Sequence, residues 1–162
     1  MSYGGLAVKG GGEVESYEGI KRIRAAGILV MGKLGLTPQS IYKYGTYSVR
    51  AKEGEEAQKL IEDAKALEEA GCFGIVLEKV PAELAKKVSD ALNIPVIGIG
   101  AGAGVDGQVL VFHDLVGMTH QFHPRFLRRY LNLYDEITGA IGQYVQDVKD
   151  VDFPNEGESY TS

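Results

Sequence analysis

The chain has 162 residues, enough for one domain with a real core, and its 44% hydrophobic and 24% charged residues are typical of a globular protein. Its net charge of -5 argues against a nucleic-acid-binding surface. The single cysteine, Cys72, excludes an intramolecular disulfide. No segment is long and apolar enough to span a bilayer, and the first residues lack the pattern of a signal peptide, so we expect a cytoplasmic protein.

Short apolar runs alternate with helical patterns along the chain, which predicts a parallel sheet with right-handed crossovers. The expected strands, about five in number, are residues 6–8, 28–31, 73–77, 95–99 and 108–112. The expected helices are residues 13–26, 55–70, 81–92 and 124–148.

A complete eight-stranded barrel needs about 250 residues, with ~200 as the lower limit. The fold class is therefore predicted to be α/β, as a smaller open sheet or as part of a barrel. All of residues 1–162 are assigned to one domain. The long helix at 124–148 carries aromatic side chains on more than one side, as expected of a helix that covers both its own domain and a partner.

Glu78 is the candidate catalytic base. It follows the apolar run 73–77 and precedes Pro81, which is typical of the first turn of a helix, so it is expected at the carboxyl end of a strand. Ligands gather at that edge of a parallel sheet, and apolar neighbours raise the pKa of a carboxyl group, which suits proton transfer. The alternative is a surface glutamate at a helix start, where the dipole stabilises an anion.

Two further segments follow strands. Gly98, Gly100 and Gly102 lie in a glycine-rich loop that leads to another strand, not to the helix of a dinucleotide-binding site. They are predicted to form part of a pocket wall, or else a tight turn between core strands. Lys33, in the segment 32–40, is a candidate anion-binding residue. The three histidines match no zinc-binding spacing, so the sequence predicts no metal site for them.

Four segments in combination resemble the ketopantoate hydroxymethyltransferase family. They are GKLGLTPQS at 32–40, VLEKVPAELA at 76–85, IPVIGIGAG at 94–102 and DGQVLV at 106–111. The ending DFPNE at 152–156 is similar as well, so the resemblance runs from about Val8 to the end of the chain.

The resemblance implies an incomplete (βα)8 TIM barrel and a homo-oligomer, since members of the family are typically decamers. It also implies the transfer of a hydroxymethyl group from 5,10-methylenetetrahydrofolate to 3-methyl-2-oxobutanoate in pantothenate biosynthesis, with Mg²⁺ chelating the oxo acid. Glu78 matches the catalytic glutamate of the family, which removes the C3 proton. Lys9 is the best match for its substrate-binding lysine.

Three departures from the family pattern bear on activity. The first barrel strands are expected to be missing, together with two metal-binding aspartates and a substrate-binding serine. The glutamate of the metal shell falls where this chain has Gly10 or Gly11, and the histidine of the family is Lys33. The Mg²⁺ site is therefore predicted to be absent, and the isolated chain to be inactive or nearly so.

Two other functions stay open at this point. The chain could be a non-catalytic assembly or scaffold protein that keeps the core and the helix at 124–148. It could also be a phosphate- or nucleotide-binding α/β module that uses the loop at 98–104.

Overall fold

A computed structural model describes residues 7–11, 14–35 and 54–160 of the chain. The chain divides into two compact units, Met1–Val109 and Leu110–Ser162. The first unit contains the sheet and the second contains a long helix, and each is described by itself.

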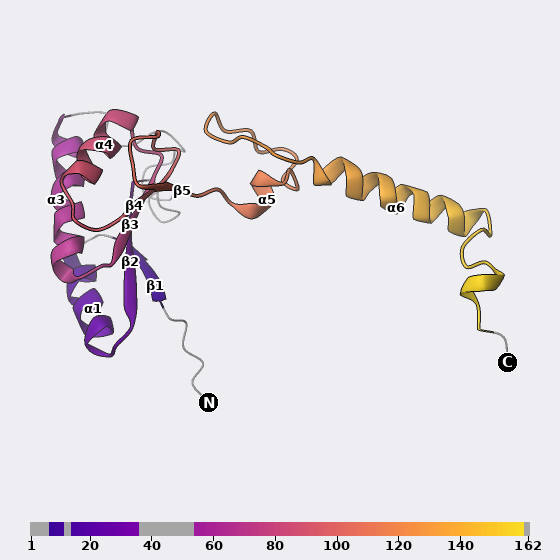
Figure 1. The fold of residues 1–162 in the computed structure, drawn as a ribbon, viewed down its shortest axis with the longest axis horizontal. Coiled ribbons are helices and arrows are strands. Elements are labelled where there is room, and N and C mark those ends of the chain that lie inside the picture. Colours follow the sequence, from indigo (N-terminus) through magenta and orange to yellow (C-terminus); the bar gives the residue numbers. More distant parts are fainter. Residues whose placement is uncertain (1–6, 12–13, 36–53, 161–162) are drawn as a thin grey trace. The chain divides into compact units, whose positions relative to one another are not determined.

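The first unit is built on a parallel sheet of five strands in the order β1-β2-β3-β4-β5 (Figure 1). The strands are β1 (Ala7–Gly11), β2 (Leu29–Gly35), β3 (Gly74–Glu78), β4 (Val96–Ile99) and β5 (Gly107–Gln108). Each strand lies beside the next one in the sequence, so the chain never reverses its direction of travel across the sheet.

Three helices connect these strands and lie on one side of the sheet in Figure 1: α1 (Val14–Ala25), α3 (Gly54–Ala70) and α4 (Ala82–Asp90). In α3 the buried residues Leu60, Ala64 and Leu67 recur at helical spacing and form the stripe that faces the sheet. Gly71 ends the helix at φ 93°, in the left-handed region that favours glycine.

One face of the sheet makes the core with these helices. Its fully buried strand residues include Val30, Ile75, Leu77 and Val96. A Cβ added at Gly32, which lies opposite Ile75, would come within 2.9 Å of the Leu67 side chain, so the α3 helix packs directly on the backbone here. Because strand residues alternate between faces, Lys33 and Val76 belong to the opposite face.

This arrangement is that of a piece of a barrel wall. A doubly wound sheet has helices on both faces and a point where the strand order reverses, whereas a barrel has sequential strands with its helices outside. The prediction of an α/β fold that forms part of a TIM barrel, with about five parallel strands, is confirmed. The face opposite the helices corresponds to the inside of such a barrel.

The prediction of a strand at residues 108–112 is wrong for most of that range. Val109 still donates its backbone N–H to Gly98, but β5 ends at Gln108, and the chain then forms a helical turn, α5 (Phe112–Leu115). The backbone carbonyl of Val111 accepts hydrogen bonds from Asp114 and Leu115 and so begins that turn. Val109, Val111 and Phe112 are 44%, 51% and 64% exposed, so these apolar residues do not form the buried strand that their composition predicts.

The long helix of the second unit, α6 (Leu133–Lys149), begins later than the Pro124 start that the sequence predicts. The preceding residues pair with another segment instead. The backbone N–H groups of Tyr130 and Leu133 donate to the carbonyls of Leu115 and Val116. The Arg129 guanidinium donates to the backbone carbonyls of residues 119, 120 and 122. After α6, a short 3-10 helix, η1 (Glu156–Glu158), begins at an Asn155 capping box.

Cys72 is buried between the end of α3 and the start of β3. Burial raises the pKa of its thiol, and the nearby Arg24 guanidinium partly offsets that shift. In the described part of the chain, no helix has the length and apolarity needed to cross a membrane.

Replacing Gly35 by alanine is expected to destabilise the first unit by at least about 2 kcal/mol. Gly35 has a φ of 90°, and an added Cβ would lie 2.2 Å from the backbone oxygen of Glu78. Urea unfolding followed by circular dichroism measures the loss. Gly19→Ala is the matched control, because nothing lies within 4 Å of its added Cβ and helix α1 favours alanine. Equal stability of the two variants would contradict this account of Gly35.

Candidate active site at the carboxyl ends of β2 and β3

Glu78 is the last residue of β3, at the carboxyl edge of the sheet where the sequence predicts it. The chain turns sharply after it: Lys79 has a φ of 52°, and α4 begins at Ala82. The Lys79 N–H donates to the carbonyl of Ile99 on β4 at 2.9 Å, which anchors the backbone beside Glu78. The side chain of Glu78 is 26% exposed, so the carboxylate is held in a defined place and remains accessible.

Lys33 pairs with this carboxylate. Its Nζ lies 2.5 Å from Oε2 of Glu78, and only 11% of the lysine side chain is exposed. The parallel register explains the contact: Lys33 lies opposite Val76 and Gly35 lies opposite Glu78, so both side chains belong to the face opposite α1, α3 and α4. Because Gly35 has no side chain, nothing projects from β2 next to the carboxylate at that level.

Lys33 is the one charged residue among the buried side chains of the described segments. A lysine in that position needs a counter-ion, because moving a lone ammonium out of water costs several kcal/mol. Glu78 provides it. The pair is neutral as a whole, and each partner fixes the orientation of the other.

The sequence did not predict this pairing, although it named both residues separately. The signal that could have found it is the strand register, since both residues lie near the ends of neighbouring parallel strands. A shift of one residue in either strand would turn one of the two side chains to the helix-covered face.

Lys9 lies in β1 opposite Met31 of β2, and Gly11 lies opposite Lys33. Lys9 therefore lies on β1, the strand next to the one that carries Lys33. It is two residues closer to the amino end of its strand than Gly11, which is the residue opposite Lys33. The backbone of the strand is described but the Lys9 side chain is not, so its role in substrate binding stays a prediction.

The three glycines of the predicted pocket loop have distinct surroundings. Gly98 is buried in β4, where an added Cβ would lie 3.0 Å from the Val105 side chain. Gly100 and Gly102 both have positive φ angles, and an added Cβ at Gly102 would lie 2.4 Å from that of Ala82 in α4. The loop therefore turns tightly against the start of α4, and its role as a pocket wall stays a prediction.

The predicted loss of the Mg²⁺ site can be compared with the described residues only in part, and it stays a prediction. No group of three or more His, Cys, Asp or Glu side chains comes together among them. Glu78, the carboxylate closest to the predicted chemistry, already accepts from an ammonium that would repel a cation. Of the histidines, His120 stacks on Tyr134 and His113 contacts Phe112 edge to face.

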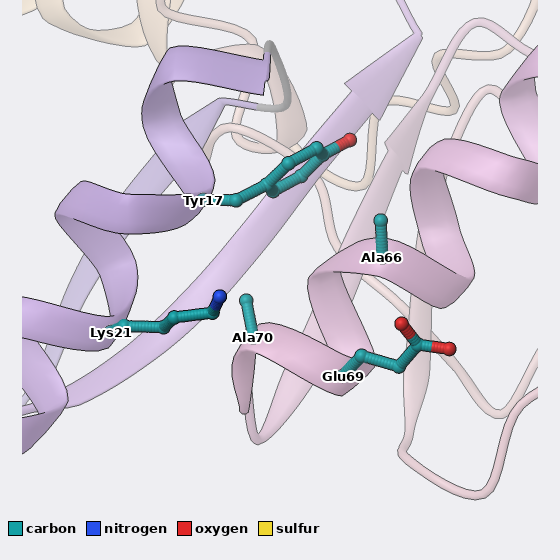
Figure 2. A pocket seen from close by; sticks show the side chains of 5 residues that line it. All are labelled: Tyr17, Lys21, Ala66, Glu69 and Ala70. Atoms are coloured by element: carbon teal, nitrogen blue, oxygen red, sulfur yellow. The ribbon is translucent and has the colours of Figure 1, made fainter.

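A separate groove of about 310 Å³ lies between α1 and α3 (Figure 2). Its lining residues are Tyr17, Lys21, Ala66, Glu69 and Ala70. Burial raises the pKa of Tyr17 to about 12, with the charge of Asp63 and a 3.2 Å hydrogen bond from the phenol to that carboxylate acting in the same direction. The groove belongs to the helix layer, so it is not part of the face that carries Lys33 and Glu78. No motif in the sequence predicts this groove.

The chain matches known proteins over almost all of its length. The sequence model of the family described as ketopantoate hydroxymethyltransferase matches residues 2–156. The chain belongs to the ketopantoate hydroxymethyltransferase family. Proteins named 3-methyl-2-oxobutanoate hydroxymethyltransferase are similar to it: that of Flavobacterium johnsoniae is 69% identical over 157 residues, and that of Christiangramia forsetii 66%.

The chain spans only part of these ketopantoate hydroxymethyltransferases. Each alignment covers 97% of this chain and 58% of the relative. Among solved structures, the YdjI aldolase from Escherichia coli K12 aligns with a TM-score of 0.34 and 18% identity, over 69% of this chain and 47% of the aldolase. That similarity is too weak to bear on the fold.

Breaking the Lys33–Glu78 pair from either side is expected to destabilise the chain by about 1 to 3 kcal/mol, because the remaining charge is left without a counter-ion. The variants are Lys33→Met and Glu78→Gln, with urea unfolding as the measurement. The double variant should be more stable than the sum of the two losses predicts.

The pair Lys86–Asp90 is the matched control, since its atoms are 2.8 Å apart but both side chains are more than half exposed. Lys86→Met is expected to cost less than about 0.5 kcal/mol. Strictly additive losses at Lys33 and Glu78 would show that the two side chains do not interact in solution.

Proposed function

We propose that this chain supplies the general base of a hydroxymethyltransferase that acts on a 2-oxo acid. Glu78 removes the C3 proton of 3-methyl-2-oxobutanoate, and the resulting carbanion equivalent attacks the one-carbon unit of 5,10-methylenetetrahydrofolate. The observation that carries the proposal is the accessible Glu78 carboxylate at the carboxyl edge of a parallel sheet, on the face that corresponds to the inside of a barrel.

The names of the relatives support the substrate. They are called 3-methyl-2-oxobutanoate hydroxymethyltransferases, and the aligned region includes Glu78 and Lys33. A Mg²⁺ ion bound to the oxo acid would act as a Lewis acid, and no group of three or more His, Cys, Asp or Glu side chains gathers among the described residues of this chain. A role for Lys9 or Lys33 in binding the substrate carboxylate is part of the same proposal.

We also propose that the isolated 162-residue chain does not complete the reaction. A barrel closes with eight strands, whereas this sheet has five, and the aligned region is 58% of the relatives. Such an open sheet leaves strand edges that further strands would cover.

The test combines the 162-residue chain with the remaining N-terminal segment of the Flavobacterium johnsoniae relative. Ketopantoate formation is expected from the mixture and not from either part alone. The Glu78→Gln variant in the same mixture should lose at least about a hundredfold in rate, as expected for a general base. Full rates with the variant would refute the role of Glu78, and enzyme-like rates from the chain alone would refute its inactivity.

A homo-oligomer is the second part of the proposal, and helix α6 supports it. Apolar side chains recur along α6 at helical spacing and are exposed within its own unit: Tyr134, Ile137, Ile141, Tyr144, Val145 and Val148. Exposed apolar stripes of this kind mark contacts with another surface. A cytoplasmic setting fits the single, buried and unpaired cysteine.

Sedimentation velocity should therefore show a species larger than a monomer. Replacing both Ile137 and Ile141 by lysine puts two charges into the stripe and is expected to shift the chain to monomers. Replacing Gln143 and Gln146 by lysine in the same helix is the control, because these residues are polar and lie outside the stripe. A wild-type monomer at all concentrations would contradict the proposal.

A further inference from the structure

We propose that Lys33 forms a Schiff base with the carbonyl group of a 2-oxo acid, with Glu78 as the group that moves the protons. The inference rests on the proposed function for its substrate class and goes beyond it in assigning the electrophilic step to Lys33. Two observations carry it: a primary amine buried in the face of the sheet that corresponds to the barrel interior, and a proton acceptor 2.5 Å from it at the accessible strand end.

A lysine that attacks a carbonyl group needs to lose a proton, and it needs a base within hydrogen-bond reach to take it. Glu78 meets that requirement, because its Oε2 already accepts a hydrogen bond from the ammonium. Low exposure of the lysine limits competition from water for the amine. The Glu78 side chain is 26% exposed, so the pair is not sealed from solvent.

The steps balance as follows. Glu78 takes one proton from the Lys33 ammonium, and the free amine adds to C2 of the oxo acid to give a carbinolamine. The hydroxyl group of the carbinolamine leaves as water with the proton that Glu78 returns, which produces an iminium ion and restores the carboxylate. Glu78 then removes the C3 proton, and the electrons of that C–H bond form an enamine as the iminium nitrogen becomes neutral.

The iminium does for the substrate what a Lewis acid does: it withdraws electrons from C2 and makes the C3 proton acidic. This matters here because the described residues of the chain do not assemble a cluster of metal ligands, and the ammonium of Lys33 lies where a cation would meet the carboxylate. One residue pair can thus provide both the electron sink and the base. Three other lysine pairs of the described residues, Lys21–Glu18, Lys59–Asp63 and Lys86–Asp90, have lysine side chains that are more than half exposed.

The experiment traps the iminium by reduction. The full 162-residue chain is incubated with 3-methyl-2-oxobutanoate and sodium cyanoborohydride, and intact-protein and peptide mass spectrometry follow. The expected product is one adduct, larger than the protein by the mass of the oxo acid less one oxygen atom, on the peptide that contains Lys33. Lys33→Arg keeps a cation beside Glu78 but cannot form an imine, and it should lose the adduct. Glu78→Gln should slow trapping at least tenfold, and Lys86→Arg should leave it unchanged.

A binding measurement separates this inference from the proposed function. The same oxo acid and its 2-hydroxy analogue, which has no carbonyl group, are titrated while protein NMR spectra are recorded. Binding of both compounds without any adduct at Lys33 overturns the Schiff base and leaves the proposed function standing. Absence of binding and of adduct overturns the Schiff base, and ketopantoate formation by the mixture with the N-terminal segment then decides the proposed function. Adducts spread over exposed lysines, equally in the Lys33→Arg variant, also overturn the assignment to Lys33.

Discussion

The ion pair between Lys33 and Glu78 is the interaction on which the candidate site depends. It exists because two neighbouring parallel strands bring their residues to the same face in one register. The lysine is nearly buried and requires a counter-ion, and the glutamate is the residue in contact with it. The same contact that satisfies Lys33 also holds Glu78 at the edge of the sheet, so local stability and the geometry of the site come from a single interaction.

The described helices pack on one face of the sheet, and the Lys33–Glu78 pair lies on the other face. Helices α1, α3 and α4 cover one face, and their apolar stripes make the core with the strands. The other face carries Lys33, Val76 and Glu78, which a barrel would enclose. A charged pair on the helix-covered face would displace apolar contacts, whereas on this face it can meet a substrate. The fold therefore separates the residues that stabilise the sheet from those available for chemistry.

Gly35 allows β2 to approach the end of β3 beside Glu78. Its positive φ and its close approach to the Glu78 carbonyl are possible because it has no Cβ. The backbone of β2 thereby packs closely against the end of β3.

The sequence by itself determined the alternation of strands and helices, the five-stranded α/β fold and the place of Glu78 at a strand end. These follow from local apolar runs, helical periodicity and the position of Pro81, which act over a few residues. The strand end at Gln108 and the start of α6 at Leu133 were decided by tertiary structure. Backbone groups near Tyr130 and Leu133 find partners far from their own turn of helix. The Lys33–Glu78 pair also depends on tertiary structure. The two residues are 45 positions apart in the sequence, and they meet only if β2 and β3 pair in this register. That register is set by the packing of one whole face of the sheet.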